Sequence, residues 1–234
     1  FTYDATNKKY IIKEGIPYDK NNYPKPGYWK FEDTDNSGMI TEEDRTIIGN
    51  ANPKLYGGLT NNFTWKGFDL SVFLNFSIGN KIYGANQMYY TKFNNRWRNT
   101  LKDKALDRFT VMNDKGEYIF DDPEQLAAVN KDRHYVSIDG SSNLSFHSGY
   151  VEDGSFLKIN NISLGYTLPK SLVTKIKLSN VRFYATGYNL HTFTKYSGYD
   201  PEVNTCANNG LTPSIDWGAY PSAISVVFGA NISF

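Results

Sequence analysis

Five segments of the chain alternate between apolar and polar residues with the two-residue period of a β-strand. The clearest is 68–78, where every second residue from Phe68 to Ile78 is apolar. The last runs through "AISVVFGANISF" and is apolar at alternate positions from Ile224 to the final Phe234. An apolar face of this length needs an apolar surrounding along the whole strand. The pattern predicts strands at 55–65, 68–78, 155–168, 180–190 and 222–234.

Three local signals refine this prediction. Lys66-Gly67 is a link of hairpin length with a glycine available for positive φ. The apolar positions change parity at Asn160-Asn161, which predicts a β-bulge. Asp122 before Pro123 predicts the N-terminus of a short helix inside the longest connection.

The connections between strands alternate between short and long, as in an up-and-down barrel of the outer membrane. Counting back from Phe234 places Lys66-Gly67 and the connection 169–179 at one rim, which is then periplasmic. The long loops 79–154 and 191–221 are then extracellular. An aromatic belt is expected at the periplasmic rim, formed by Trp65, Phe68, Tyr166, Phe183 and Phe234. From periodicity alone, the same aromatics also suit the core of a soluble β-sandwich.

Composition is compatible with this fold and excludes several functions. The mean hydropathy is −0.52 and no stretch is long and apolar enough for a membrane helix, but a barrel that is polar inside keeps a low average. The formal net charge of +1, without a basic run, gives no reason to expect nucleic acid as a partner. Cys206 is the single cysteine, so an internal disulfide is excluded. The sequence lacks an initiator methionine and an export signal, so it is interpreted as a C-terminal piece of a longer protein.

The sharpest local motif is "DTDNSGMITEED", residues 33–44, which predicts a structural calcium site. Oxygen ligands recur at alternate positions around a turn that Gly38 permits. The loop departs from an EF-hand because its last ligand is an aspartate, as in dockerin-type loops, and because 27–32 favours a strand instead of an entering helix. The expected ligands are Asp33, Asp35, Ser37, the carbonyl of Met39, and Asp44. Alternatively, Thr41 and Asp44 form an N-cap pair, and the turn needs no metal.

Other candidate residues carry weaker signals. Trp97, Tyr196 and Trp217 fall in the predicted extracellular loops and are candidates for stacking on sugar rings, although loop packing is the commoner role. The three histidines show no metal-ligand spacing and are expected on the surface or in loops. No nucleophile elbow, Walker loop or dinucleotide fingerprint occurs, so an enzyme is not expected.

Several separate segments together resemble one family. From "GYWKFEDTDNSGMITEEDRTIIGN" through "GSFLKINNISLGYTLPK" and "VRFYATGYNLHTFTKYSGYDPEV" to "FGANISF", the chain resembles the C-terminal barrel region of SusC/RagA-like TonB-dependent outer-membrane transporters of Bacteroidetes. The resemblance covers about 27–234, except for roughly 85–150. It implies an all-β fold in which 55–234 supplies the last five strands of a 22-stranded antiparallel barrel. Residues 1–54 would be an extracellular loop region, and the plug domain would lie outside this chain.

The resemblance also implies function and partners. It suggests import of a nutrient, an oligosaccharide or a peptide, across the bacterial outer membrane. The partners would be the lipid bilayer, a SusD-like surface lipoprotein and TonB, which contacts the missing N-terminal part. The barrel-assembly machinery would read a terminal signal at Phe228, Ile232 and Phe234.

A second reading remains open from the residues. A secreted, calcium-stabilised β-sandwich that binds carbohydrate through its loop aromatics would show the same alternation. The two readings differ in what covers the apolar face of 68–78. A sandwich buries that face against a second sheet, whereas a barrel presents it to lipid.

Overall fold

The computed structural model describes residues 1–92, 97, 99–140, 146–206 and 210–234, and divides the chain into two compact units. One unit combines 1–48 with 86–150, and the other combines 49–85 with 151–234. No helix in the described ranges is long and apolar enough to cross a membrane.

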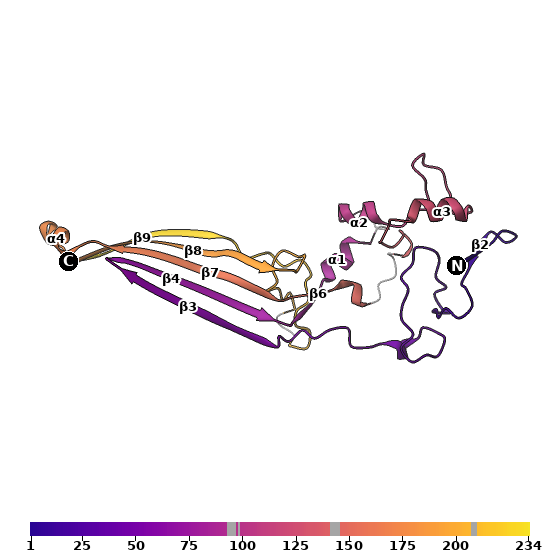
Figure 1. Cartoon of the computed structure of the whole chain (residues 1–234), viewed down its shortest axis with the longest axis horizontal. Helices are drawn as coiled ribbons and strands as arrows, with labels where there is room; N and C mark the ends of the chain where they lie inside the picture. Colours follow the sequence, from indigo (N-terminus) through magenta and orange to yellow (C-terminus); the bar gives the residue numbers. More distant parts are fainter. Residues whose placement is uncertain (93–96, 98, 141–145, 207–209) are drawn as a thin grey trace. The chain divides into compact units, whose positions relative to one another are not determined.

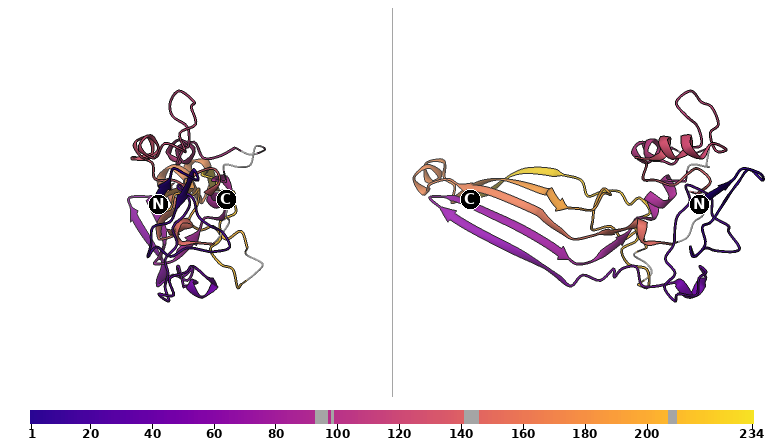
Figure 2. Two further views of the ribbon diagram at one scale, coloured as in Figure 1. Left: turned by 90° about the vertical axis from the view of Figure 1, so that its right-hand side faces the viewer. Right: turned by 45° about the vertical axis from the view of Figure 1, so that its right-hand side comes forward.

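The unit formed by 49–85 and 151–234 is built on one antiparallel sheet of five strands in the order β3-β4-β7-β8-β9 (Figure 1). The strands run side by side in the right-hand view of Figure 2 as well. The short pair β5 (Lys81–Tyr83) and β6 (Val151–Asp153) extends β4 and precedes β7. α4 (Lys170–Val173) and the 3-10 turn η4 (Thr174–Ile176) connect β7 to β8. The five strands are β3 Leu55–Trp65, β4 Phe68–Ile78, β7 Phe156–Thr167, β8 Asn180–Thr194 and β9 Ser225–Ser233.

These bounds coincide closely with the ranges that the alternation indicated, and β8 continues to Thr194 where the pattern had ended at 190. The β-bulge is confirmed, because the register with β4 and with β8 shifts around Asn160. The hairpin is also confirmed. Both turn residues have positive φ, 46° at Lys66 and 88° at Gly67, as a type I′ turn requires.

The register joins the apolar positions into a continuous face. One row across all five strands is Phe63, Leu70, Leu164, Ala185 and Phe228. The next row is Trp65, Phe68, Tyr166, Phe183 and Ala230, so four residues of the predicted aromatic belt lie side by side. The ring centroids of Phe68 and Tyr166 are 4.5 Å apart. The hairpin, the 168–179 connection and the C-terminus all lie at this end of the sheet.

This apolar face is exposed in the described parts of the chain. The exposed fraction is 60% for Phe63 and 79% for Phe228, in the two edge strands. No second sheet in the described ranges packs on it; the only other sheets are two-stranded. The structure therefore lacks the buried sheet-on-sheet core that the sandwich reading requires.

The unit formed by 1–48 and 86–150 contains short elements around a small core. Its buried apolar side chains include Met88, Ile119, Leu126, Val136 and Tyr150. The predicted helix is confirmed as α3, in which the Asp122 side chain accepts from the Gln125 N–H and Pro123 is the first residue. The elements are β1 Thr2–Asp4, β2 Lys9–Ile11, η1 Glu42–Asp44, α1 Ala85–Tyr90, α2 Lys102–Asp107, α3 Pro123–Asn130 and η3 Ser148–Tyr150.

Candidate functional site

The polar face of the five-stranded sheet carries every charged residue within its strands: Asp69, Lys158 and Arg182. Each lies at a position whose side chain points away from the apolar face. Each also makes an ion pair with a carboxylate or guanidinium brought close by the fold. The polar face is therefore the one that carries the ion pairs and their hydrogen-bond networks.

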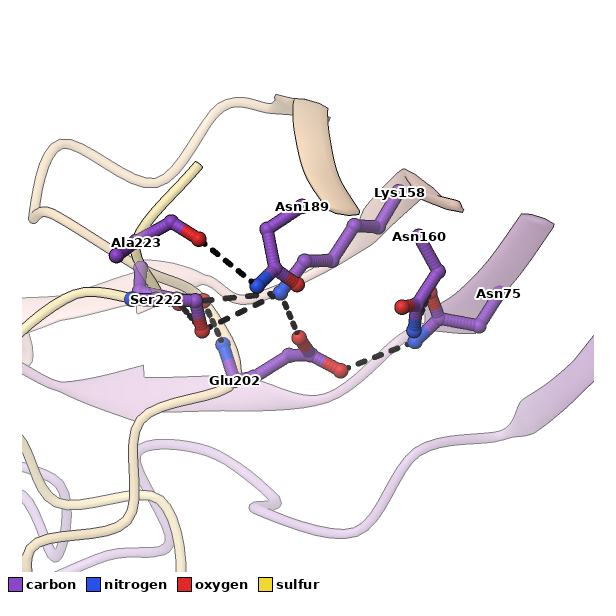
Figure 3. A network of polar contacts seen from close by, with 8 residues as sticks. Asn75, Lys158, Asn160, Asn189, Glu202, Ser222 and Ala223 are labelled. Carbon is purple, nitrogen blue, oxygen red and sulfur yellow. Dashed lines mark hydrogen bonds and ion pairs between the residues drawn. The ribbon is translucent and has the colours of Figure 1, made fainter. Parts of the chain in front are cut away.

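Lys158 is the centre of the larger network (Figure 3). It lies in β7 opposite Asn75 of β4 and is only 3% exposed. Its Nζ lies 2.5 Å from Glu202 Oε2 and 4.0 Å from Asp200 Oδ2, and it donates to Ser222 Oγ at 3.4 Å. A buried ammonium is stable only when it is paired and hydrogen-bonded in this way.

The carboxylates of the network are themselves held by other donors. Asn75 Nδ2 donates to Glu202 Oε1 at 3.0 Å. Asp200 accepts from the Glu202 N–H at 3.0 Å, and from the N–H and Oγ of Ser222 at 3.2 and 2.9 Å. Burial by itself raises the pKa of Asp200, but these donors and the charge of Lys158 bring that pKa below its ordinary value. Asp200 therefore stays ionised at neutral pH.

A groove runs beside this network. Its lining includes Tyr56, Asn75, Ser77, Asn80 and Glu202. Asn80 is 6% exposed, and its Oδ1 accepts from Ser77 Oγ at 3.0 Å. The described lining combines a carboxylate, amides and hydroxyls with apolar side chains such as Phe76, Phe156 and Val203, a mixture that suits a ligand with both polar and apolar groups.

The second ion pair lies near the opposite end of the sheet. Arg182 donates from Nε to Asp69 Oδ1 at 2.9 Å and from Nη2 to Oδ2 at 2.5 Å, a bidentate arrangement. The pair crosses over Gly165, which faces Asp69 in the register. A Cβ at Gly165 would lie 2.5 Å from Asp69 Oδ1 and 2.6 Å from Arg182 Nε, so only glycine leaves room for the pair.

The loop 33–44 brings together part of the predicted calcium ligands. One carboxylate oxygen from each of Asp33, Asp35 and Asp44 lies within 4.8 Å of the others. The oxygens of the other two predicted ligands also lie side by side, since Ser37 Oγ donates to the Met39 carbonyl at 3.1 Å. The prediction of a strand at 27–32 is wrong, because these residues form neither strand nor helix.

The alternative reading of the same loop also has a counterpart in the structure. Thr41 Oγ1 accepts from the Glu43 N–H, and Asp44 Oδ2 accepts from the Thr41 N–H at 2.7 Å, which completes a capping box. Asp44 Oδ1 accepts from the Thr34 N–H at 2.7 Å. The Thr41 bond in particular lowers the pKa of Asp44, and bonds from Ser37 lower the pKa of Asp35. These carboxylates are ionised at neutral pH, with or without a metal.

The predicted loop aromatics differ in accessibility. Trp97 and Trp217 are exposed by 86% and 51%. Tyr196 is only 5% exposed and donates from its hydroxyl to Asp216 Oδ2, so it is part of the core with Ile82 and Val203. Burial, followed by the hydrogen bond to Asp216, raises the pKa of Tyr196. The structure therefore places Tyr196 in the core and leaves Trp97 and Trp217 as the accessible members of the predicted set.

His147 lies in a loop, as expected, but it is buried in an aromatic cluster that no sequence pattern indicates. His147 is 9% exposed, and its ring centroid lies 4.5 Å from that of Trp29 and 4.6 Å from that of Tyr150. Its Nδ1 accepts from the Gly149 N–H at 3.1 Å, so the proton of the neutral ring sits on Nε2. Burial lowers the pKa of His147.

Comparison with known proteins identifies the class to which this sheet belongs. The chain is 32% identical over 215 residues to the TonB-dependent receptor P3 of Formosa agariphila, covering 89% of this chain and 19% of that protein. It is 29% identical over 194 residues to receptor P39 of the same organism, with 82% and 17% covered. The matches are to TonB-dependent receptors, and one of them is SusC of Bacteroides thetaiotaomicron, 28% identical over 232 residues, with 98% and 20% covered.

Solved structures agree on the fold. A structure of the RagAB peptide transporter superposes with a TM-score of 0.63 at 22% identity, covering 85% of this chain and 19% of that chain. A "closed-closed" structure of the RagAB peptide importer gives 0.63 at 24% identity over the same shares of the two chains. No family model matches the chain. The predicted resemblance is confirmed: over most of its length the chain is a homologue of SusC/RagA-like TonB-dependent transporters, and it spans about a fifth of their length.

Proposed function

We propose that the chain is part of a TonB-dependent transporter of the bacterial outer membrane, which imports a nutrient such as an oligosaccharide or a peptide together with a SusD-like lipoprotein. The observation that carries the proposal is the apolar face, which is continuous over five strands and exposed in a homologue of TonB-dependent receptors. Lipid is the surrounding that suits such a face, and the charged polar face then lines the interior of a barrel. No catalytic step is assigned to this chain.

The proposal makes the two faces of one strand respond differently to the same substitution. Val72 faces the apolar side in the middle of β4, and its neighbour Ser71 faces the polar side. Val72→Lys puts a charge into lipid at a cost of about 2–4 kcal/mol, whereas Ser71→Lys puts it into a polar interior. The full transporter is expressed in a bacterial host, and its heat-modifiable folded form is quantified in the outer membrane.

We expect the folded yield to fall for Val72→Lys and to stay near that of the unsubstituted protein for Ser71→Lys. Uptake by the full transporter is then compared in hosts with and without TonB. Full recovery of the unsubstituted protein in the soluble fraction, or uptake that is equal without TonB, would contradict the proposal. In the first case the calcium-stabilised binding module would take its place.

The proposal also gives the C-terminal residues a role. Phe228, Ile232 and Phe234 are exposed by 79%, 52% and 95%. We infer that they form the signal recognised by the barrel-assembly machinery. Replacing Phe234 by serine is expected to reduce outer-membrane assembly, while the same change at the exposed Phe1 leaves assembly unchanged.

The calcium site stays a proposal of its own. Three carboxylates close together support it, and the predicted ligand oxygens of Ser37 and Met39 are hydrogen-bonded to each other. Calcium titration of the full protein by calorimetry should show one binding event that Asp35→Asn removes and Asp19→Asn, outside the loop, preserves. Absence of any binding heat at millimolar calcium would leave the capping box as the sole role of Asp44.

A further inference from the structure

Lys158 connects parts of the chain that are far apart in sequence. Its two carboxylate partners, Asp200 and Glu202, follow β8, while its third partner, Ser222, precedes β9. These partners are 44 residues (Glu202) and 64 residues (Ser222) from Lys158 in sequence. A single ammonium group of β7 therefore contacts both ends of the long connection between β8 and β9.

The two ends of that connection are also bonded to each other. Asp200 Oδ2 accepts from both the N–H and the Oγ of Ser222. Asn189 Nδ2 donates to the carbonyl of Ala223 at 3.0 Å (Figure 3). Asn189 has φ of 52° and lies in the irregular part of β8 opposite the bulge at Asn160. The bulge and its unpaired partners thus supply the amide that fixes Ala223.

The charges explain why Lys158 dominates this arrangement. The network holds one positive and two negative charges, and Lys158 is the sole cation that the described contacts place beside Asp200 and Glu202. Removing one partner of a buried ion pair leaves the remaining charge desolvated and uncompensated. Without Lys158, two carboxylates would face each other on a sheet surface that no longer attracts either.

We propose that Lys158 is a positioning residue that holds 200–202 and 222–223 against the polar face of the sheet and thereby forms the wall of the groove beside Glu202. Pro201, Glu202, Val203 and Asn204 line this groove opposite residues of β3 and β4. The positioning role of Lys158 rests on the proposed function in one respect, namely that the polar face is taken to be part of the import path. In that setting Lys158 fixes the shape of the groove along that path, although it is itself too buried to contact a ligand.

Hydrogen exchange of the full transporter in detergent, followed by mass spectrometry, tests the proposal. The amides of Glu202 and Ser222 are direct reporters, because both donate to the Asp200 carboxylate. In Lys158→Met we expect peptides containing these amides to exchange at least about tenfold faster, since the carboxylates separate. Lys158→Arg retains the charge and offers a fork of donors, so exchange should remain within about threefold of the original rate.

The matched control is Lys175→Met, the same change at an exposed lysine of η4. It should leave both peptides unchanged, and in every variant the ladder amides of β7 and β8 should keep their protection. The proposal is overturned if Lys158→Met leaves the reporters as slow as before. It is also overturned if Lys158→Arg exchanges as fast as Lys158→Met, or if the whole sheet loses protection together. Uptake is measured separately, so a failure of the transport proposal and a failure of the positioning role give different results.

Discussion

The ion pair between Asp69 and Arg182 should determine whether Gly165→Ala lowers or raises the stability of the protein. Gly165→Ala adds a Cβ that would lie 2.5 Å from Asp69 Oδ1 and 2.6 Å from Arg182 Nε. Overpacking of this kind costs about 1–3 kcal/mol, and alanine recovers about 0.5–1 kcal/mol of the chain entropy that glycine loses in a strand. The expected net effect is a loss of about 1–2 kcal/mol in the free energy of unfolding.

The same substitution should behave differently once the pair is gone. The side chains of Asp69 and Arg182 are 34% and 26% exposed, so the pair contributes only about 0–1 kcal/mol by itself. In an Asp69→Ala, Arg182→Ala background the clash is absent. Gly165→Ala should then stabilise the protein by about 0.5–1 kcal/mol. The change of sign, rather than the size of either effect, is the result that the geometry requires.

Urea unfolding of the full transporter in lipid vesicles, followed by tryptophan fluorescence, measures both free energies. Gly58→Ala is the control, because a Cβ there would lie 2.8 Å from Phe73 Cε2, away from the pair. Its effect should be the same in both backgrounds. If Gly165→Ala has the same effect with and without the pair, the pair does not determine the need for glycine, and the reasoning is refuted.

Three further predictions follow from single contacts. Tyr196→Phe removes a buried hydrogen bond to the Asp216 carboxylate and should cost about 1–3 kcal/mol in urea unfolding, whereas Tyr199→Phe, at a residue 81% exposed, should be neutral. Burial holds the pKa of His147 below 6.5, so its contribution to the stability of the fold is complete above pH 6.5 and is lost as the pH falls toward the lowered value. Hydrogen exchange of the amides around His147 should therefore accelerate on acidification. The acceleration should be smaller in His147→Phe, which has no group to protonate. Lys66→Asn should raise stability by a few tenths to about 1 kcal/mol, because asparagine adopts positive φ more readily; unchanged or lower stability in the same urea assay would contradict this.

The sheet could be predicted because its information is local. Alternation fixes which residues share a face, and the parity change at Asn160 marks the bulge, since one extra residue reverses every later side chain. The aromatic row at Trp65 and Phe68 follows from the strand ends and the two-residue turn. None of this requires knowledge of a contact between distant residues.

The networks could not be predicted, because they depend on how connections return to the sheet. A lysine within a strand at position 158 indicates a polar-facing charge, but nothing local points to Glu202, which is 44 residues away. The burial of Tyr196 and His147 has the same origin. Each lies in or beside a connection whose path is set by tertiary packing, so its environment is invisible to periodicity. The assembly of 1–48 with 86–150 into one unit is likewise non-local.

The distribution of charge in the strands connects the sheet, which the sequence predicts, with the side-chain networks, which it does not predict. Asp69, Lys158 and Arg182 lie on one face, and both ion pairs formed there are bidentate or buried. A face open to bulk water does not need such pairing, since exposed charges are solvated individually and surface pairs contribute little. Lys158 does need it, because at 3% exposure its charge is cut off from water and must find its own partner. The opposite face carries no charge in any of its five strands, which is the division that the proposed wall between lipid and a polar interior requires.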